Sequence, residues 1–390
     1  MVDPYQQIQE WESHLLGAPL RIAGKAGVPF STTLAPGVEL CAAHLHPAAT
    51  ERIAVFGGGI APLGVVLSRL SPQGRVRLCE PHSVASDLAR RTLERNGCTN
   101  AAIETGISLL PEGAEQFERV ILLAPQSRAL ARRWIVEAAE LLCPGGKLHI
   151  AGANNQGVRS LVGDAEAVLG PGKILAHGGG ARLAEFRRPE TFPKAPDWAQ
   201  APGIAPGSWI RLELGLPGGP LELRSLPGIF SADHLDPGTA FLLAHLEIPS
   251  GAQVLDVGCG YGPIGVAAAQ LGAAHVDLSD VNLLAVAAAT ANVAALGIPA
   301  AVFAGDALDP LAGHSYDLIV SNPPFHAGRS IDPAMTTAFI KQSRAHLKPG
   351  GRLILVANSF LPYDRLMREQ GLQVRITADD RRYRVIIGEM

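Results

Sequence analysis

The residues whose types and spacing best suit chemistry stand in one short segment, Ser321-Asn322-Pro323-Pro324-Phe325, directly after an apolar run. Two consecutive prolines fix the backbone and remove two N–H donors, so neighbouring carbonyl oxygens stay free to accept hydrogen bonds. The Asn322 amide oxygen and the Pro323 carbonyl are acceptors that can hold both hydrogens of an –NH2 group. Phe325 offers a flat face on which a base can stack. We therefore predict that Asn322, Pro323 and Phe325 orient an amine for reaction.

The chemistry that this segment supports depends on alignment. An exocyclic amine is planar and poorly nucleophilic, so positioning matters more than a strong base. His326 follows the segment, and we interpret it as a contact to the substrate base rather than as a general base. The alternative interpretation of the whole segment is a rigid turn after a strand.

A glycine-rich turn lies upstream, between an apolar run and an alanine-rich stretch typical of a helix. Its Gly258, Gly260 and Gly262 let the backbone turn sharply and approach a ligand closely. Dinucleotide enzymes use a similar turn, so the glycines alone discriminate poorly. Asp256 precedes them and the turn has no lysine to hold a phosphate. This combination favours a cationic ligand over a pyrophosphate.

Acidic residues also follow the next two apolar runs. Asp280 ends the second run, where a carboxylate can accept hydrogen bonds from both hydroxyls of a ribose. Asp306 follows the third run, where it suits an adenine amino group. A single Asp at such a position is more often a helix cap, so the prediction of a ligand site rests on the set.

These side chains require a scaffold that brings strand ends together. Apolar runs at 254–257, 275–279, 317–321 and 352–357 alternate with helical stretches. This alternation predicts a mostly parallel sheet covered by helices on both faces. Ligands of such sheets bind at the carboxyl ends of the strands, which is where the candidate residues fall.

The same plan occurs twice along the chain. Three segments of the first half resemble three of the second in the same order: Ile53–Gly64 and Leu255–Gly265, Phe117–Gln126 and Tyr316–Phe325, and the stretches that begin at Leu141 and His346. We therefore predict an α/β fold with two tandem Rossmann-like domains. Residues 1–188 form the first domain, the proline-rich residues 189–206 a linker, and residues 207–390 the second, which a hairpin opens.

The cofactor residues resemble those of the class I S-adenosylmethionine methyltransferases. This resemblance implies that both domains have the class I methyltransferase fold and that S-adenosylmethionine is the cofactor. It also implies that Asp256 and the glycines flank the amino-acid end of the cofactor, that Asp280 holds its ribose and that Asp306 holds its adenine.

The resemblance is closer over roughly residues 205–390. Leu226–Ser231, Leu235–Gly238, Asn322–His326 and Val356–Tyr363 resemble the rRNA guanine-N2 methyltransferases of the small-subunit methyltransferase C type. That family implies methyl transfer to the N2 amine of a guanine in 16S rRNA, within a small ribosomal subunit or its assembly intermediate, by a monomer. It also adds Gly238 to the cofactor site. Ala327 departs from the family, which has an acid there.

The first half has lost the residues that carry chemistry. Val55 stands where the second half has Asp256, and Leu123-Ala124-Pro125-Gln126 replaces the Asn-Pro-Pro-Phe segment. We expect this domain to be catalytically inactive and to have a structural or RNA-binding role.

Composition and charge restrict the remaining possibilities. The net charge of −3 is not typical of a nucleic-acid-binding protein, but Arg381, Arg382 and Arg384 gather near the C-terminus as candidate phosphate contacts. Five scattered cysteines, an odd number, argue against a metal cluster or a disulfide framework. The chain shows no secretory signal and no membrane-length apolar segment. We therefore expect a cytoplasmic protein with no metal.

Other activities use the same arrangement of acceptors to hold an amine or amide nitrogen. The alternatives are N2 methylation of guanine in 23S rRNA, N6 methylation of adenine in a nucleic acid, and N5 methylation of a glutamine side chain in a protein. The glutamine enzymes usually have Tyr in place of Phe325 and lack a duplicated first half. A further alternative, an assembly factor with two inactive domains, conflicts with the intact Asp256, Asp280 and Asn322.

Overall fold

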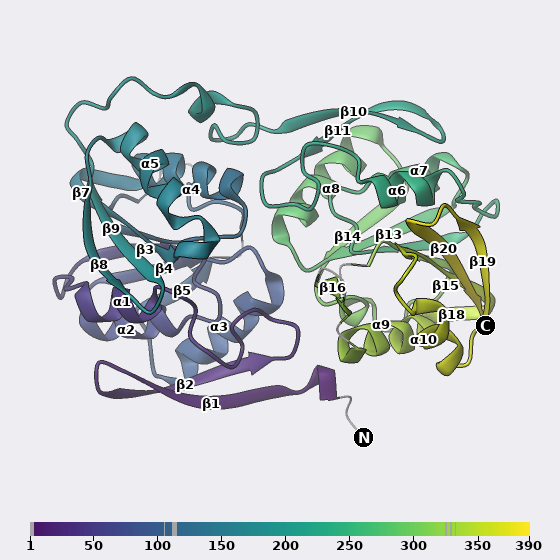
Figure 1. Cartoon of the computed structure of the whole chain (residues 1–390), viewed down its shortest axis with the longest axis horizontal. Helices are drawn as coiled ribbons and strands as arrows, with labels where there is room; N and C mark the ends of the chain where they lie inside the picture. The colour runs from purple at the N-terminus through teal and green to yellow at the C-terminus, as the bar shows by residue number, and fades with distance from the viewer. Residues whose placement is uncertain (1–3, 105, 111–114, 324–325, 328–329, 332) are drawn as a thin grey trace. The chain divides into compact units, whose positions relative to one another are not determined.

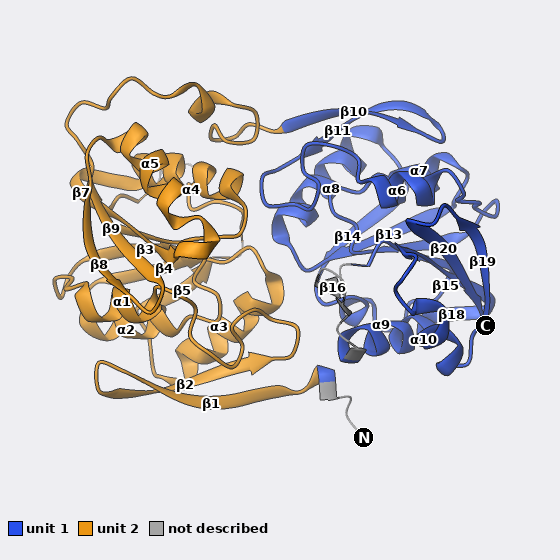
Figure 2. Cartoon of the chain, in the orientation of Figure 1, with its two compact units in different colours: residues 1–5, 210–390 blue, residues 6–209 orange. Residues whose placement is uncertain are grey.

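The computed structural model describes residues 4–104, 106–110, 115–323, 326–327, 330–331 and 333–390. Two compact units divide the chain (Figure 2): residues 6–209 form unit 2, and residues 210–390 together with 1–5 form unit 1. The proline-rich segment 189–206 belongs to unit 2, where residues Asp197–Gln200 form a 3-10 turn. The boundary between the units, at Trp209 and Ile210, thus follows the segment that we expect to be a linker.

Unit 1 is built on a seven-stranded sheet with the order β14-β13-β12-β15-β18-β20-β19. The first five strands in that order are parallel, and β20 is antiparallel to both of its neighbours, β18 and β19. The strands span β12 Gln253–Val257, β13 His275–Asp280, β14 Ala300–Ala304, β15 Tyr316–Ser321, β18 Leu347–Asn358, β19 Gln373–Asp379 and β20 Tyr383–Glu389. The parallel strands of the centre are almost wholly buried, as a sheet covered on both faces requires.

Helices cover both faces of this sheet. Figure 1 shows α6, α7 and α8 on one face and α9 and α10 on the other. They span α6 Pro237–Leu243, α7 Pro263–Gln270, α8 Leu283–Leu296, α9 Pro333–His346 and α10 Tyr363–Glu369. The core between the sheet and α9 and α10 includes Leu255, Ile319 and Phe339. A hairpin of β10 (Ile210–Leu216) and β11 (Gly219–Ser225) opens the unit, and the short strands β16 (His326–Ala327) and β17 (Ser330–Ile331) pair with each other.

Unit 2 repeats the architecture. Its seven-stranded sheet has the order β5-β4-β3-β6-β7-β9-β8, in which β9 is antiparallel to both of its neighbours, β7 and β8. The strands span β1 Ile8–Leu15, β2 Ala18–Lys25, β3 Arg52–Phe56, β4 Arg75–Cys79, β5 Ala101–Glu104, β6 Phe117–Leu123, β7 Leu142–Ala153, β8 Lys173–Gly178 and β9 Ala181–Arg187. The helices span α1 Val38–His44, α2 Pro62–Leu70, α3 Ser83–Arg95, α4 Arg128–Leu141 and α5 Val158–Leu169. β1 and β2 form a hairpin that precedes the sheet, as β10 and β11 do.

The predicted fold of two tandem, mostly parallel sheets with helices on both faces is confirmed. In each unit the chain reverses direction across the sheet at the central strand, β12 or β3, and ligands bind beside such a reversal at the carboxyl ends of the strands. In the part of the chain that the structure describes, no helix is long and apolar enough to cross a membrane. The described residues also contain no cluster of three or more His, Cys, Asp or Glu side chains suited to a metal.

Candidate active site

A pocket of about 400 Å³ opens at the carboxyl ends of β12, β13 and β15 in unit 1. Sequence-predicted residues from separate segments meet in its wall: Gly258, Gly260, Asp280, Asp306, Asn322 and Pro323. The sheet brings them together because β13 and β15 both pair with β12, in parallel.

The glycine turn and Asp280 form one rigid substructure. Gly258 and Gly260 adopt positive φ values of 71° and 57°, a conformation that costs little only for glycine. The Gly260 N–H donates to Asp280 Oδ2 (2.9 Å), and the Asn282 N–H donates to Asp280 Oδ1 (2.8 Å). Burial raises the pKa of Asp280, and these backbone donors partly offset that rise. Asp280 therefore shapes the turn as well as facing the pocket.

Asp256 lies beneath the turn rather than in the pocket wall. Its side chain is fully buried, and its Oδ2 accepts a hydrogen bond from the Gly265 N–H of α7 (2.9 Å). Its Oδ1 is buried and has no hydrogen-bond partner among the described residues. Burial raises the pKa of Asp256 to about 7, and the nearby Asp280 charge adds to that rise. A nearby positive charge would stabilise the ionised form of this buried carboxylate, so Asp256 is suited to a positively charged ligand.

The other two predicted glycines pack inside the fold. Gly262 is the N-cap of α7, with a φ of 92°. Gly238 lies in the first turn of α6, where a Cβ atom would come within 3.0 Å of Asp236 Oδ2 and 3.2 Å of the Tyr383 ring. Gly238 thus allows the tip of the β19–β20 hairpin to approach α6. Cofactor contacts of Gly238, Gly262 and Asp256 remain predictions, as do those of the predicted residues that line the pocket.

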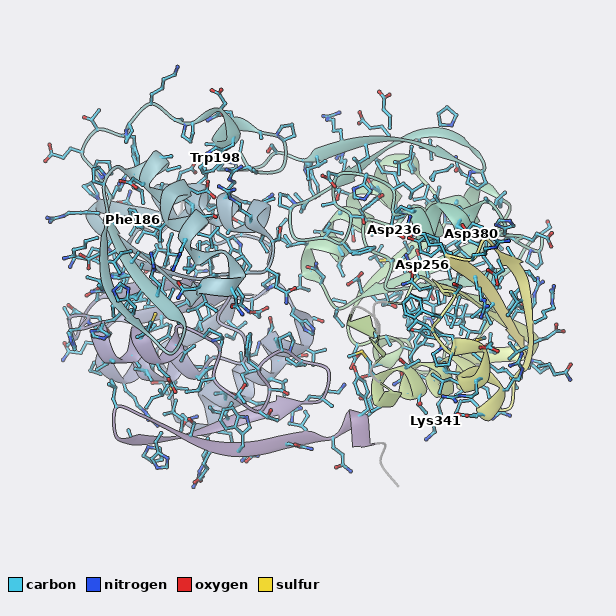
Figure 3. All side chains as sticks on the ribbon, viewed as in Figure 1. Phe186, Trp198, Asp236, Asp256, Lys341 and Asp380 are labelled. Carbon is cyan, nitrogen blue, oxygen red and sulfur yellow. The ribbon has the colours of Figure 1, made fainter. Side chains whose placement is uncertain are left out.

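Asn322 belongs to a polar cluster that the sequence analysis did not identify. Its Nδ2 donates to Asp236 Oδ2 and to Thr239 Oγ1, both at 2.9 Å. Asp236 is also the N-cap of α6 and accepts from the Thr239 N–H (2.8 Å). Asp236, Thr239 and Asn322 all line the pocket, and Asp236 and Asp256 are labelled in Figure 3. A comparison of the two halves could have found Asp236 and Thr239, because LDPGTAFLLAHL and LAPGVELCAAHL share their LxPG start and AHL end, with alanine and valine in place of the two polar residues.

A second residue missed by the sequence analysis is Tyr5. Its hydroxyl donates to Asp306 Oδ1 (3.1 Å), and its side chain is buried. Residues 1–5 belong to unit 1 although they precede unit 2 in the chain. No motif in the sequence links Tyr5 to a residue 301 positions away.

The predicted substrate residues are placed less completely. Phe325 lies outside the described residues, and the side chain of His326 does too, although its backbone forms part of β16. Arg381 and Arg382 are exposed in the turn between β19 and β20. Arg384 donates to Asp379 Oδ2 (2.8 Å), so its charge is already paired. The Ser359 N–H donates to the Arg382 carbonyl (2.9 Å), which fixes the turn to the end of β18.

Unit 2 keeps the geometry of the glycine turn but lacks several polar residues that surround it in unit 1. Glu80 occupies the position of Asp280, and its Oε2 accepts from the Gly59 N–H (2.8 Å) just as Asp280 accepts from Gly260. The strand registers align Val55 with Asp256 and place Leu123, one residue past the last aligned pair, at the position of Asn322. In the sequence, Gly106-Ile107 stands where unit 1 has Gly305-Asp306. The turn and the acid that supports it are thus kept in unit 2, whereas the positions of Asp256, Asp306 and Asn322 hold apolar residues.

Comparisons with known proteins agree with this geometry. A family model described as Methyltransferase small domain matches residues 19–180 and 220–387. The ribosomal RNA small subunit methyltransferase C of Pseudomonas entomophila is 37% identical over 71% of this chain and 80% of its own length. That of Shewanella loihica is 33% identical over 73% and 81%. The solved structure of a T. thermophilus 16S rRNA N2 methyltransferase, in complex with AdoMet and guanosine, matches with a TM-score of 0.80 and 27% identity over 99% of both chains.

Proposed function

The chain belongs to the ribosomal RNA small subunit methyltransferase C family, and from that premise we propose that it transfers a methyl group from S-adenosylmethionine to the N2 amine of a guanine in 16S ribosomal RNA. S-adenosylmethionine supplies an electrophilic methyl group on a sulfonium. The pocket suits this cofactor because Asp280 and Asp306 line it and the Asp256 Oδ1 atom, which is buried without a partner among the described residues, lies beneath it. These carboxylates favour a cation with ribose and adenine groups over a pyrophosphate.

The observation that carries the proposal is the Asn322 amide. Both of its N–H groups are engaged within the protein, so the Oδ1 atom is the part of the amide left to accept a hydrogen bond in the pocket. The Pro323 carbonyl supplies a second acceptor, and together they would hold the two amine hydrogens of guanine. The nitrogen lone pair is then directed at the methyl group, and catalysis consists mainly of this alignment.

The remaining substrate contacts follow from the same proposal. Phe325 would stack on the flipped guanine and His326 would contact it, because a base must leave its stack to enter a pocket. Arg381 and Arg382 would contact phosphates. Unit 2, without the ligand-facing acids, would be catalytically inactive and would hold RNA or support unit 1. We propose that a monomer acts in the cytoplasm on the small subunit or its assembly intermediate.

The test is methyl transfer from labelled S-adenosylmethionine to unmodified small and large ribosomal subunits and to their free RNAs, followed by nucleoside digestion. We expect label in N2-methylguanine of 16S rRNA. Label in N2-methylguanine of 23S rRNA would change the substrate, and label in N6-methyladenine would change the target base. Label in protein alone would support glutamine methylation and refute an rRNA substrate.

A further inference from the structure

The Asn322 amide is held by hydrogen bonds that determine which of its two ends faces the pocket. A primary amide nitrogen carries two hydrogens, and here one is donated to Asp236 Oδ2 and the other to Thr239 Oγ1. An ionised carboxylate has no hydrogen to donate, so the amide nitrogen must face Asp236. If the amide were rotated by half a turn, its oxygen would face the carboxylate and its –NH2 would face the substrate amine, donor to donor.

Asp236 is itself fixed in place. It is the N-cap of α6, and its Oδ2 accepts from the Thr239 N–H as well as from Asn322. Thr239 is 7% exposed, and Ser321, next to Asn322, donates from its hydroxyl to the Val257 carbonyl (2.7 Å). The helix start and the strand end are therefore tied to each other through the Asn322 side chain.

Unit 2 provides an internal comparison. In the repeated LxPG segment, Ala35 stands in place of Asp236 and Val38 in place of Thr239. The position of Asn322 is taken by Leu123. Val38 and Leu123 are buried in one hydrophobic cluster against which Ala35 packs. All three polar residues have been replaced together by apolar ones, whereas Glu80 keeps the turn-supporting role of Asp280. This pattern fits three residues that serve one purpose separate from the support of the fold.

We infer that Asp236 and Thr239 are a positioning pair, which orients the Asn322 amide so that its Oδ1 accepts from the substrate amine. The inference rests on the proposed function, because it assigns Asp236 and Thr239 a role only through Asn322. They act in the transfer step rather than in holding the cofactor.

Thr239→Val tests the pair with little change in shape, and Thr239→Ser is its matched control, because serine keeps the hydroxyl. Methyl transfer is measured with the full chain and the ribosomal particle or RNA that accepts most label. Cofactor affinity is measured separately by calorimetry. Loss of one neutral hydrogen bond predicts a kcat roughly 5- to 10-fold lower for Thr239→Val. We expect the S-adenosylmethionine Kd to stay within about twofold and Thr239→Ser to restore most of the rate.

A double-mutant cycle with Asn322→Ala separates positioning from a general structural effect. Asn322→Ala is expected to lower kcat by roughly 10²- to 10³-fold, and adding Thr239→Val to it should change kcat no further. An equal loss from Thr239→Val in both backgrounds would overturn the inference, as would a normal kcat for Thr239→Val alone. A normal kcat for Asn322→Ala would instead overturn the proposed function's claim that Asn322 holds the substrate amine.

Discussion

At the scale of single residues, unit 1 holds a buried carboxylate, Asp256, and a half-buried one, Asp280, close to one glycine turn. Asp280 accepts backbone hydrogen bonds on both of its carboxylate oxygens. Among the described residues, Asp256 accepts a hydrogen bond on only one of its two oxygens. This difference has a physical consequence, because burial without compensating partners penalises the charged form. Asp256 therefore has a pKa of about 7 in the folded protein, against about 4 for an unfolded aspartate.

The raised pKa of Asp256 predicts a pH-dependent stability. Between the unfolded and folded pKa values the folded state holds one more proton, so the stability of unit 1 falls as pH rises through this window. Relative to Asp256→Asn, the wild-type chain should lose roughly 2 to 3 kcal/mol of unfolding free energy between pH 5 and pH 8. Denaturant unfolding of both chains at each pH measures the difference.

Asp317→Asn is the control for this experiment. Asp317 is partly exposed and pairs with Lys348 (2.8 Å), an interaction that lowers its pKa. Its contribution is present above the unfolded pKa and is lost only in acid, so it should not change between pH 5 and pH 8. The assignment of a raised pKa to Asp256 fails if Asp256→Asn shows the same pH dependence as the wild-type chain.

The sequence analysis identified the residues that belong to motifs but not the residues that hydrogen-bond to them. Asn322, Asp280 and Asp306 stand at strand ends and could be predicted from a parallel sheet. Asp236 lies 86 positions from Asn322 and Tyr5 lies 301 from Asp306, and no local pattern encodes such pairs. Asp256 was expected beside the cofactor, whereas its burial beneath the turn depends on how α7 packs on β12.

At the scale of elements, the β19–β20 hairpin brings charge to the active-site edge of the sheet. Its turn carries Arg381 and Arg382, and Tyr383 packs beside Gly238 at the start of α6. Because α6 also begins with Asp236, the hairpin tip lies on the same side of unit 1 as the pocket. On the proposed function, this placement would let a chain with a net charge of −3 present positive charge to RNA beside the pocket.

Replacing Arg381 and Arg382 with glutamine should therefore weaken RNA binding and flatten its salt dependence. Removing one phosphate-binding arginine lowers the slope of log K against log salt by about 0.7 to 0.9, so the double variant should show up to about twice that change. Titration of RNA binding at several salt concentrations gives the slope. Arg375→Gln is the matched control, because Arg375 is exposed on β19 at the end of the hairpin away from the turn. Equal slopes for wild type and the double variant would exclude these phosphate contacts.

The N-terminal segment is the second element with a consequence for the site. Tyr5→Phe removes the hydroxyl that donates to Asp306, and we expect S-adenosylmethionine to bind roughly 3- to 10-fold more weakly because Asp306 loses a fixed orientation. Tyr316→Phe is the control, since it breaks a similar Tyr–Asp bond (2.7 Å, to Asp277) outside the pocket. Tighter binding by Tyr5→Phe in calorimetry would show instead that Tyr5 competes with the cofactor.

At the scale of the whole molecule, two copies of one fold have diverged in what they bind. Unit 2 keeps the sheet order, the hairpin and the glycine turn of unit 1. Val55 and Ala35 replace Asp256 and Asp236 and belong to or pack against one hydrophobic cluster, whereas Asp236 lines a pocket in unit 1. The alternation of apolar runs and helical stretches could predict two mostly parallel sheets, whereas the strand order, in which β15 pairs with β12, depends on pairing between residues far apart in the sequence.

The aromatic residues allow this divergence to be measured in the intact chain. All four tryptophans lie in unit 2, and all five tyrosines lie in unit 1. Tryptophan fluorescence therefore reports unfolding of unit 2, and the tyrosine near-UV circular dichroism band reports unfolding of unit 1. S-adenosylmethionine at 100 times its Kd should stabilise the tyrosine-detected transition by about 2.7 kcal/mol. The tryptophan-detected transition should not move, because unit 2 lacks the acids that would hold the cofactor.

Asp306→Ala provides the control for cofactor binding to unit 1. In this variant the shift of the tyrosine-detected transition should shrink or vanish, because Asp306 lines the pocket. A tryptophan-detected shift that persists in Asp306→Ala would require a second cofactor site in unit 2. Such a site would mean that Glu80 and its glycine turn still bind a ligand, and that the replacement of the other acids abolished methyl transfer without abolishing binding.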